Sequence, residues 1–354
     1  MSNKRYSKPL TMIATLLLLA LTAGSLSSCK GGGKSRNPLG ASGRPLSLMV
    51  VLPDQYDSEA LRDSVRRAFS QALPILPQPE PALDVMFTTH SRFTSMFRSQ
   101  RNILYISIDP ERYTGPSISV SRNDYALGQI LLHAKAESEE SVYTILRLRN
   151  DSMIRTVFDE EVERRLVVLN ETFSSAFARA VEEQVGGVTV NAPVELEFIQ
   201  TGDHFVWGSN MAQENRMDFV VYSFPFRDKE TFTRDYLIHK RDSVLGRQIK
   251  GQFPGSRMMT ETMLMPVFSA KEYKGAYRAE LRGLWAMTND MMGGPFVMHA
   301  IVKGDKSEVV VAEAFVYNPS GKKRNLLLYD ESALYTLRLE GADYWSHSID
   351  KTSK

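Results

Sequence analysis

Apolar residues recur at strand or helix spacing along most of the chain. Leu46–Leu52 is a short apolar run, and Asp57–Ala72 places apolar residues every three or four positions. These stretches predict a strand followed by a helix. Further strands are predicted over Ile103–Ile108 and Leu127–Ala134, and the Pro-rich segment Leu76–Pro81 predicts a rigid extended connector, because each proline removes a donor and fixes φ.

The most regular helical pattern spans Asp151–Gln184, where apolar residues recur every three or four positions. Asn150 or Asp151 is available as its N-terminal cap, and Gly186-Gly187 is expected to end it. The pattern predicts one amphipathic helix of about 50 Å, with a shorter helix over Glu137–Arg149 packed beside it. Phe173 lies on the apolar stripe. We therefore expect its ring to be part of the core.

After Gly187 the pattern changes to short apolar or alternating runs, with a helix predicted over Lys229–Ile249 and another over Asn325–Leu339. Residues 304–307 predict a hairpin turn within a meander. The predicted strands are Val194–Ile199, Phe205–Gly208, Phe219–Phe224, Ala276–Met287, Phe296–Val302 and Val309–Tyr317.

This order of elements predicts an α+β fold with mixed and antiparallel sheets and long amphipathic helices. A similar order of strand, helix, Pro-containing loop and strand near Leu46 and near Phe219 suggests two related lobes. We expect a signal peptide over residues 1–28 and a tether over 29–45. An N-terminal lobe with the long helix then covers 46–187, a β-rich lobe covers 188–340, and a tail covers 341–354.

The N-terminus has the features of a lipoprotein leader. A basic start is followed by the apolar run Leu10–Leu21 and by Leu26-Ser27-Ser28-Cys29, which resembles a bacterial lipobox. Cys29 is the only cysteine, so we expect it to carry a lipid rather than a disulfide or a metal. Lys30, where inner-membrane retention would place Asp, points to the outer membrane. The sequence does not indicate which membrane face displays the protein.

Composition excludes several classes of protein. With 43% hydrophobic and 24% charged residues, the 354-residue chain is an ordinary globular sequence. The net charge of +2 includes Lys4, Arg5 and Lys8 of the leader, so the remainder is close to neutral. This balance argues against nucleic-acid binding. The six histidines are scattered, with no pair at i, i+4, so we expect no metal site and no cofactor.

Arg241 is the clearest candidate for a functional polar residue. On a helical wheel of Lys229–Ile249 it lies at the centre of the apolar side, and Arg234 and Gln248 lie one heptad away on the same line. A buried guanidinium needs a partner, so Arg241 is either a structural ion pair with an acid such as Glu280 or part of a site for an anionic ligand.

A second group of candidates lies towards the C-terminus. Trp285, Gly293 and Gly294 belong to a segment rich in Met and Gly, which fits either a groove for a partner or a tightly packed strand end. For Lys322-Lys323-Arg324 we expect a solvated turn rather than a phosphate clamp. His204, in a Gly-led turn, is a weaker candidate. The full set for a ligand or partner site is Arg241, Arg282, Trp285, Gly293, Gly294 and Arg324, with Cys29 for lipid attachment.

The chain resembles an uncharacterised lipoprotein family of the Bacteroidetes that carries a domain of unknown function. The most specific blocks of this resemblance are Arg282-Gly283-Leu284-Trp285 and Met292-Gly293-Gly294-Pro295-Phe296. One departure is Arg257-Met258 after Pro254-Gly255-Ser256, where the family pattern leads us to expect Tyr. The resemblance implies an envelope location and a single family-wide domain, and it implies no activity.

The sequence therefore favours an outer-membrane lipoprotein that binds or scaffolds an envelope protein or glycan through its C-terminal lobe. No common hydrolase or nucleotide motif is present, so we lean against an enzyme. Two alternatives remain: an envelope hydrolase of glycan or peptide that uses carboxylates and His204, and a carrier of a small lipidic ligand. A hydrolase needs a cleft where acid, base and Arg converge, whereas a carrier needs an enclosed apolar pocket.

Overall fold

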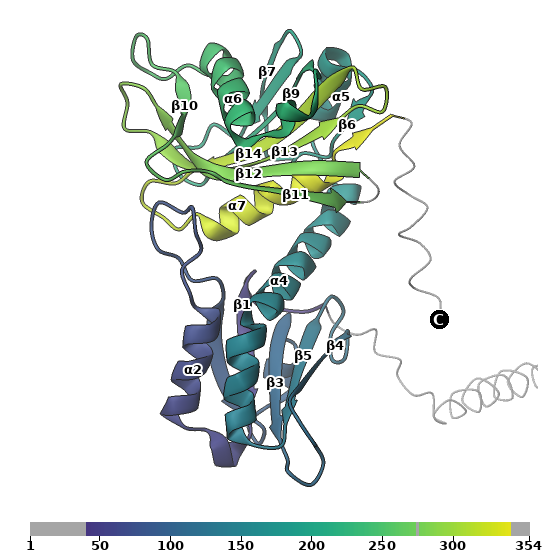
Figure 1. The fold of residues 1–354 in the computed structure, drawn as a ribbon, viewed down its shortest axis with the longest axis vertical. Helices are drawn as coiled ribbons and strands as arrows, with labels where there is room; N and C mark the ends of the chain where they lie inside the picture. The colour runs from purple at the N-terminus through teal and green to yellow at the C-terminus, as the bar shows by residue number, and fades with distance from the viewer. Residues whose placement is uncertain (1–39, 274–275, 341–354) are drawn as a thin grey trace, which may run out of the picture. The chain divides into compact units, whose positions relative to one another are not determined.

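The computed structural model describes residues 40–273 and 276–340, and two β-sheets organise them (Figure 1). The predicted signal peptide, Cys29 and the predicted tail lie outside the described residues, as do all but the last residues of the predicted tether. Within the described part of the chain, no helix is both long enough and apolar enough to cross a membrane.

The N-terminal sheet has five strands in the order β2-β1-β3-β5-β4, and only β4 runs antiparallel to its neighbour. Helices α2 (Glu59–Phe69) and α4 (Glu139–Glu171) pack against one face, where they form a continuous apolar core with the strands. The strands are β1 (Ser47–Leu52), β2 (Asp84–Thr89), β3 (Asn102–Ile108), β4 (Ser117–Arg122) and β5 (Ile130–Ala136).

The short helices η1 (Asp54–Tyr56) and α3 (Ser95–Arg98) follow β1 and β2. Phe93, just before α3, packs into a small cluster on the sheet with Met49 and Ile103.

The C-terminal sheet is antiparallel, in the order β10-β12-β13-β14-β9-β8-β7, with β11 also paired to β12. Apolar clusters cover both of its faces, which explains why strands such as β14 are almost continuously apolar. The strands are β7 (Phe198–Gly202), β8 (Phe205–Ser209), β9 (Arg216–Pro225), β10 (Met258–Glu261), β11 (Val267–Tyr273), β12 (Ala276–Met287), β13 (Gly293–Val302) and β14 (Glu308–Tyr317).

Helices α5 (Ser175–Val185) and α7 (Arg324–Glu331) pack on one side of this sheet, and α6 (Arg234–Gln248) packs on the other. The short helix η2 (Lys229–Phe232) precedes α6, and η3 (Ser332–Thr336) follows α7. The strands β6 (Val188–Thr189) and β15 (Arg338–Leu339) form a small separate pair.

The α+β class is confirmed, but the suggestion of two related lobes is wrong. The N-terminal sheet is built from parallel strands joined by crossovers, whereas every pairing in the C-terminal sheet is antiparallel. The similar order of elements near Leu46 and Phe219 therefore gives two different topologies.

The long helix does not have the predicted boundaries. Helix α4 runs without a break through residues 149–151, and the chain leaves the helix only at Thr172–Ser174. Asn150, expected as a cap, is inside the helix and donates to the Ala68 carbonyl at 3.4 Å. Phe173 lies in the break and is half-buried, so Phe177, whose ring is fully buried, is the aromatic core residue of this region. Helix α5 packs with the C-terminal sheet.

A residue of the Pro-rich connector, Glu80, links the N-terminal part of the chain to the start of α7. Glu80 is buried and accepts hydrogen bonds from the backbone N–H groups of Lys323, at 2.7 Å, and Arg324, at 3.2 Å. A carboxylate at this position satisfies free N–H groups at the start of α7. Lys323 Nζ also donates to Gln78, at 2.6 Å.

Several elements were not predicted. The strands β2, β4, β10 and β11 mix apolar with polar residues, and none of them contains the longer apolar run on which strand prediction depends. The predicted helix Asn325–Leu339 is shorter than expected: α7 ends at Glu331, and a 3₁₀ helix and a two-residue strand follow.

Candidate ligand-binding cleft

A cleft of about 610 Å³ lies between three parts of the structure. These are α4, the chain that leads from α2 into the Pro-rich connector, and the edge of the C-terminal sheet together with α7. One wall comes from α4 and the chain before it, and it combines the apolar residues Leu73, Pro74, Ile75, Leu76, Ile154, Phe158 and Val162 with Asp151, Arg155 and Asp159. The opposite wall comes from the C-terminal half and includes Ser269, Ala270, Glu280, Arg282, Arg324, Leu327, Leu328, Glu331 and Tyr335. The cleft therefore joins apolar surface to a group of charged side chains.

Arg282 stands between two carboxylates in this wall. Its Nε donates to Glu280 at 2.6 Å, and its two terminal nitrogens donate to the two oxygens of Glu331, one of them at 3.1 Å. Burial lowers the pKa of Arg282, but the nearby Glu331 and Glu280 carboxylates outweigh burial, so the pKa is raised. Arg282 therefore stays charged, and its side chain is 35% exposed to the cleft.

Fully buried groups continue this network beneath the cleft. Glu280 lies opposite His299 in the register of β12 and β13, with 3.3 Å between its carboxylate and the imidazole Nε2. The other ring nitrogen of His299 is 3.0 Å from Arg278, which also donates to the Leu334 carbonyl at 2.8 Å. His299 is therefore held from both sides and is closed off from the cleft.

Tyr335 borders the same network, with its ring edge-on to His299 at 4.9 Å between centroids. Burial, reinforced by Glu331 and Glu280, raises the pKa of the Tyr335 hydroxyl. Tyr335 is therefore a neutral phenol at neutral pH. It adds an aromatic face and a hydroxyl to the wall of the cleft.

Arg324 lies at the edge of the cleft rather than in a solvated turn. It is 5% exposed and binds the carbonyls of Pro81 and Ala82 and, at 2.6 Å, the carboxylate of Asp84. The expectation that Lys322-Lys323-Arg324 forms a solvated turn is wrong, because Lys323 and Arg324 are both buried against the connector. Arg324 thus fixes the connector that forms one wall of the cleft.

Arg241 points inward from α6, as the helical wheel predicts, and its side chain has no exposed surface. Its guanidinium makes a bidentate pair with Glu313 of β14, with the shortest contact at 2.7 Å. It also donates to the Thr260 hydroxyl at 3.0 Å and stacks over the Phe296 ring at 3.9 Å. The carboxylate partner is therefore Glu313 and not Glu280, which binds Arg282.

The other residues of the Arg241 line do not share its burial. Arg234 is partly exposed and pairs with Asp235, whereas Gln248 is half-buried and offers its backbone carbonyl to Gln200, at 3.1 Å. Of the three polar residues on this line of α6, only Arg241 is therefore part of the core. Burial raises the pKa of Glu313, although Arg241 opposes the rise.

The Trp- and Gly-rich blocks form a tightly packed strand end. Trp285 is buried, and its Nε1 donates to the Val316 carbonyl at 3.2 Å. A Cβ on Gly294 would lie 2.1 Å from that carbonyl oxygen, and one on Gly293 would lie 2.8 Å from the Trp285 carbonyl oxygen. Only glycine permits the strands to approach this closely.

The predicted site residues therefore divide into two groups. Arg282 and Arg324 lie together along the cleft, while Trp285 lies on the other face of β12, in the apolar cluster that α6 covers. His204 lies apart from both, in an exposed turn with φ 51°, where Nδ1 contacts the Ser223 hydroxyl at 3.2 Å. Among the residues that the structure describes, no group of three or more His, Cys, Asp or Glu side chains is placed to hold a metal.

Glu331 was not predicted as a residue of the site, and Glu280 was expected to pair with Arg241 rather than with Arg282. Glu280 carries a usable signal, because it is an acid in an apolar strand that also contains Arg278 and Arg282 at alternate positions. Alternate positions face the same side of a strand, so the three side chains had to meet. Glu331 offers no comparable signal, since its position depends on how α7 docks.

The regions that match known families divide the chain close to the break between α4 and α5. Residues 174–336 match the model of a domain of unknown function (DUF4837). Residues 41–170 match the model of a second domain of unknown function (DUF8532). Two separate regions of the chain are thus similar to uncharacterised domains. Where the resemblance implied a single family-wide domain, two models match, and the matched regions adjoin near Thr172–Ser174.

The chain aligns with a crystal structure of a protein from Bacteroides thetaiotaomicron VPI-5482 at 12% identity, with a TM-score of 0.24. The alignment covers 44% of this chain and 45% of that chain, so less than half of that protein is spanned. No curated protein matches the chain.

Proposed function

We propose that this protein is a lipid-anchored component of the bacterial outer membrane that binds a partner in the cleft between α4 and the C-terminal sheet, without catalysing a reaction on it. The proposal rests on one observation, which is how the charged side chains in the wall of the cleft are paired with one another. Arg282 occupies both oxygens of Glu331 and one oxygen of Glu280. These groups present fixed charges to a ligand, beside the apolar residues of the facing wall.

The same observation argues against a hydrolase. A general acid or base must have a free position from which to exchange a proton with the substrate. In this cleft Glu280 and Glu331 are held by Arg282, and His299 is fully buried beneath Glu280. The other two carboxylates of the lining also have partners: Asp151 accepts a hydrogen bond from Gln71, at 3.2 Å, and Asp159 is not free. His204, the histidine expected to serve a hydrolase, does not line the cleft.

A carrier of small lipidic ligands fits less well. Such a ligand requires an enclosed and mostly apolar pocket. The cleft instead includes the exposed Asp151, Arg155 and Asp159 on α4 in addition to its charged wall. This mixture of apolar and charged surface suits a protein or glycan partner.

The envelope location rests on the leader, the Leu26-Ser27-Ser28-Cys29 sequence and the family resemblance. Cys29→Ser should move the protein from the membrane fraction to a soluble or unprocessed pool, because lipid attachment provides the anchor. Unchanged fractionation, with no lipid mass on the N-terminal peptide, would contradict the anchor.

The binding role is tested by photo-crosslinking in cells. A photoreactive phenylalanine analogue replaces Phe158, which lines the cleft, or Val167, which is 62% exposed on the same helix and does not line the cleft. We expect a discrete adduct from position 158 only, and Ala270→Trp, which places a large side chain in the cleft, should abolish it. Equal adducts at both positions, or none at 158, would refute the binding role of the cleft.

A further inference from the structure

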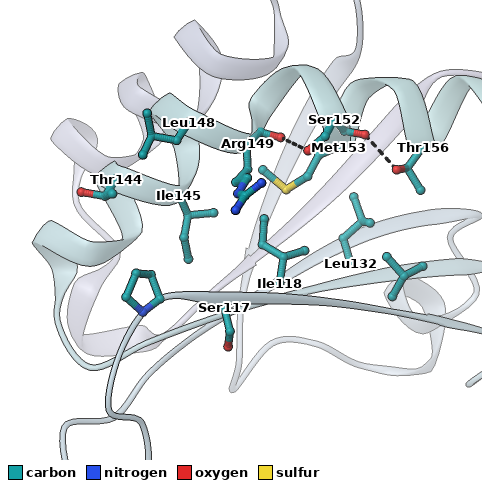
Figure 2. Close-up of a pocket in the computed structure, with 12 residues that line it drawn as sticks. Ser117, Ile118, Leu132, Thr144, Ile145, Leu148, Arg149, Ser152, Met153 and Thr156 are labelled. Carbon is teal, nitrogen blue, oxygen red and sulfur yellow. Dashed lines mark hydrogen bonds between the residues drawn. The ribbon is translucent and has the colours of Figure 1, made fainter.

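A second hollow, of about 400 Å³, lies between strand β4 and the first half of α4 (Figure 2). Its floor is apolar and includes Ile118, Leu132, Ile145 and Met153. Leu148, on the helix side, is 65% exposed. The hollow is separate from the cleft described above, since the two share no lining residue.

One side of this groove is the free edge of a sheet. In the described part of the chain, β4 pairs only with β5, so the backbone groups along its outer edge have no partner strand. The register places Ile118 opposite Ala134 and Val120 opposite Leu132, which puts both β4 side chains on the face that α4 covers. An edge strand beside a helix offers backbone hydrogen bonds and side-chain pockets to an extended peptide.

The groove contains one charged side chain, Arg149, whose guanidinium points from α4 into the hollow (Figure 2). Among the described residues, this guanidinium forms no hydrogen bond or ion pair. The backbone carbonyl of Arg149 accepts from Ser152 at 2.8 Å, which is a contact of the helix itself. A cation with no partner at the wall of an apolar groove is complementary to a carboxylate.

We propose that this groove binds an extended peptide of another protein, which adds as a strand to the free edge of β4 and pairs a carboxylate with Arg149. The carboxylate comes from an acidic side chain or from the C-terminus of the peptide. The predicted tether after Cys29 does not meet this requirement, because residues 29–39 contain Lys and Arg and no acid. The proposal does not depend on the cleft or on the function proposed for it.

Two libraries of random peptides test the proposal with the purified full-length protein. One library displays peptides with a free C-terminus and the other displays them internally, so the source of the carboxylate is read from the library that is enriched. We expect selected peptides to alternate apolar residues and to carry the carboxylate at a constant place. Arg149→Glu should weaken their binding by about tenfold or more, whereas Arg147→Glu, at an exposed site outside the groove, should not.

The strand geometry is tested on the peptide, which avoids any effect on the fold. Methylating one backbone nitrogen at a time should weaken binding at every second position, because alternate N–H groups of an added strand face β4. A loss without this period of two would overturn the proposed strand. No enrichment in either library, equal binding to the Arg149→Glu protein, or dimerisation of the protein through β4 would overturn the site itself.

Discussion

Removing Glu313 and removing Arg241 from their ion pair should change the stability of the protein to very different degrees. Both side chains are fully buried and meet at 2.7 Å. Glu313→Leu leaves a guanidinium in the core that cannot lose its proton, so we expect it to cost about 3–5 kcal/mol of unfolding free energy. Arg241→Met leaves a carboxyl group, and burial already raises the pKa of that group. The carboxyl can become neutral by taking up a proton.

The pH dependence of Arg241→Met follows from that proton. With a folded-state pKa above the unfolded value, the folded protein binds more protons, so stability falls as pH rises from the unfolded pKa towards the folded pKa. Each unit of that interval costs about 1.4 kcal/mol. Arg241→Met should therefore lose less stability at pH 5 than at pH 8, whereas Glu313→Leu should lose about the same at both.

Urea denaturation followed by circular dichroism gives these free energies. The double variant Arg241→Met/Glu313→Leu should lie within about 1 kcal/mol of the original protein or above it, because no charge is left unpaired. The exposed Arg66–Glu59 pair is the control, and the same set of variants should show little or no coupling between its two side chains. Equal losses for the two single variants, with an additive double variant, would refute this reasoning.

Three further changes test other parts of the structure by urea denaturation. Phe177→Ala should cost about 3–5 kcal/mol, whereas Phe173→Ala, in the helix break, should cost about 1 kcal/mol or less; equal losses would contradict the observed break. Asp330 is fully buried, and burial raises its pKa well above the usual value. The stability that the protein loses by burying Asp330 therefore grows as pH rises above about 4. Asp330→Asn should stabilise the protein more at pH 8 than at pH 5, and a pH-independent effect would contradict the buried carboxyl group as the cause. Gly294→Ala should cost about 2 kcal/mol or more because its Cβ meets a carbonyl oxygen, whereas Gly304→Ala, with nothing within 4 Å, should stay within about 0.5 kcal/mol; similar effects would contradict the close approach.

The features that sequence predicted well depend on local periodicity. The wheel of α6 predicted the burial of Arg241 because its neighbours Ile238, Val244 and Leu245 are apolar. The same periodicity could not identify Glu313 as the partner. That choice depends on which acids of the meander face α6, and the strand register puts Glu280 on the other face, beside Arg282.

The features that sequence missed depend on contacts between distant segments. Arg324 resembles a surface residue in a basic run, but Glu80 and Asp84 bury it from more than 200 positions away. The cleft depends on the same contacts, because the connector and α4 form one of its walls only once α7 is docked. Asn150 is the opposite case, because its sequence suggests a helix cap, but in the structure it lies inside α4 and packs against α2.

Occupancy of the cleft in the native membrane is the most direct test of the proposed function. Cys29 is the only cysteine, so once it carries its lipid, Phe158→Cys or Val167→Cys provides a single free thiol. The rate of maleimide labelling is measured for each variant in isolated membranes and after purification. A bound partner predicts that labelling at 158, relative to 167, is several-fold slower in membranes than in the purified protein. The same ratio in both preparations would contradict a partner in the cleft.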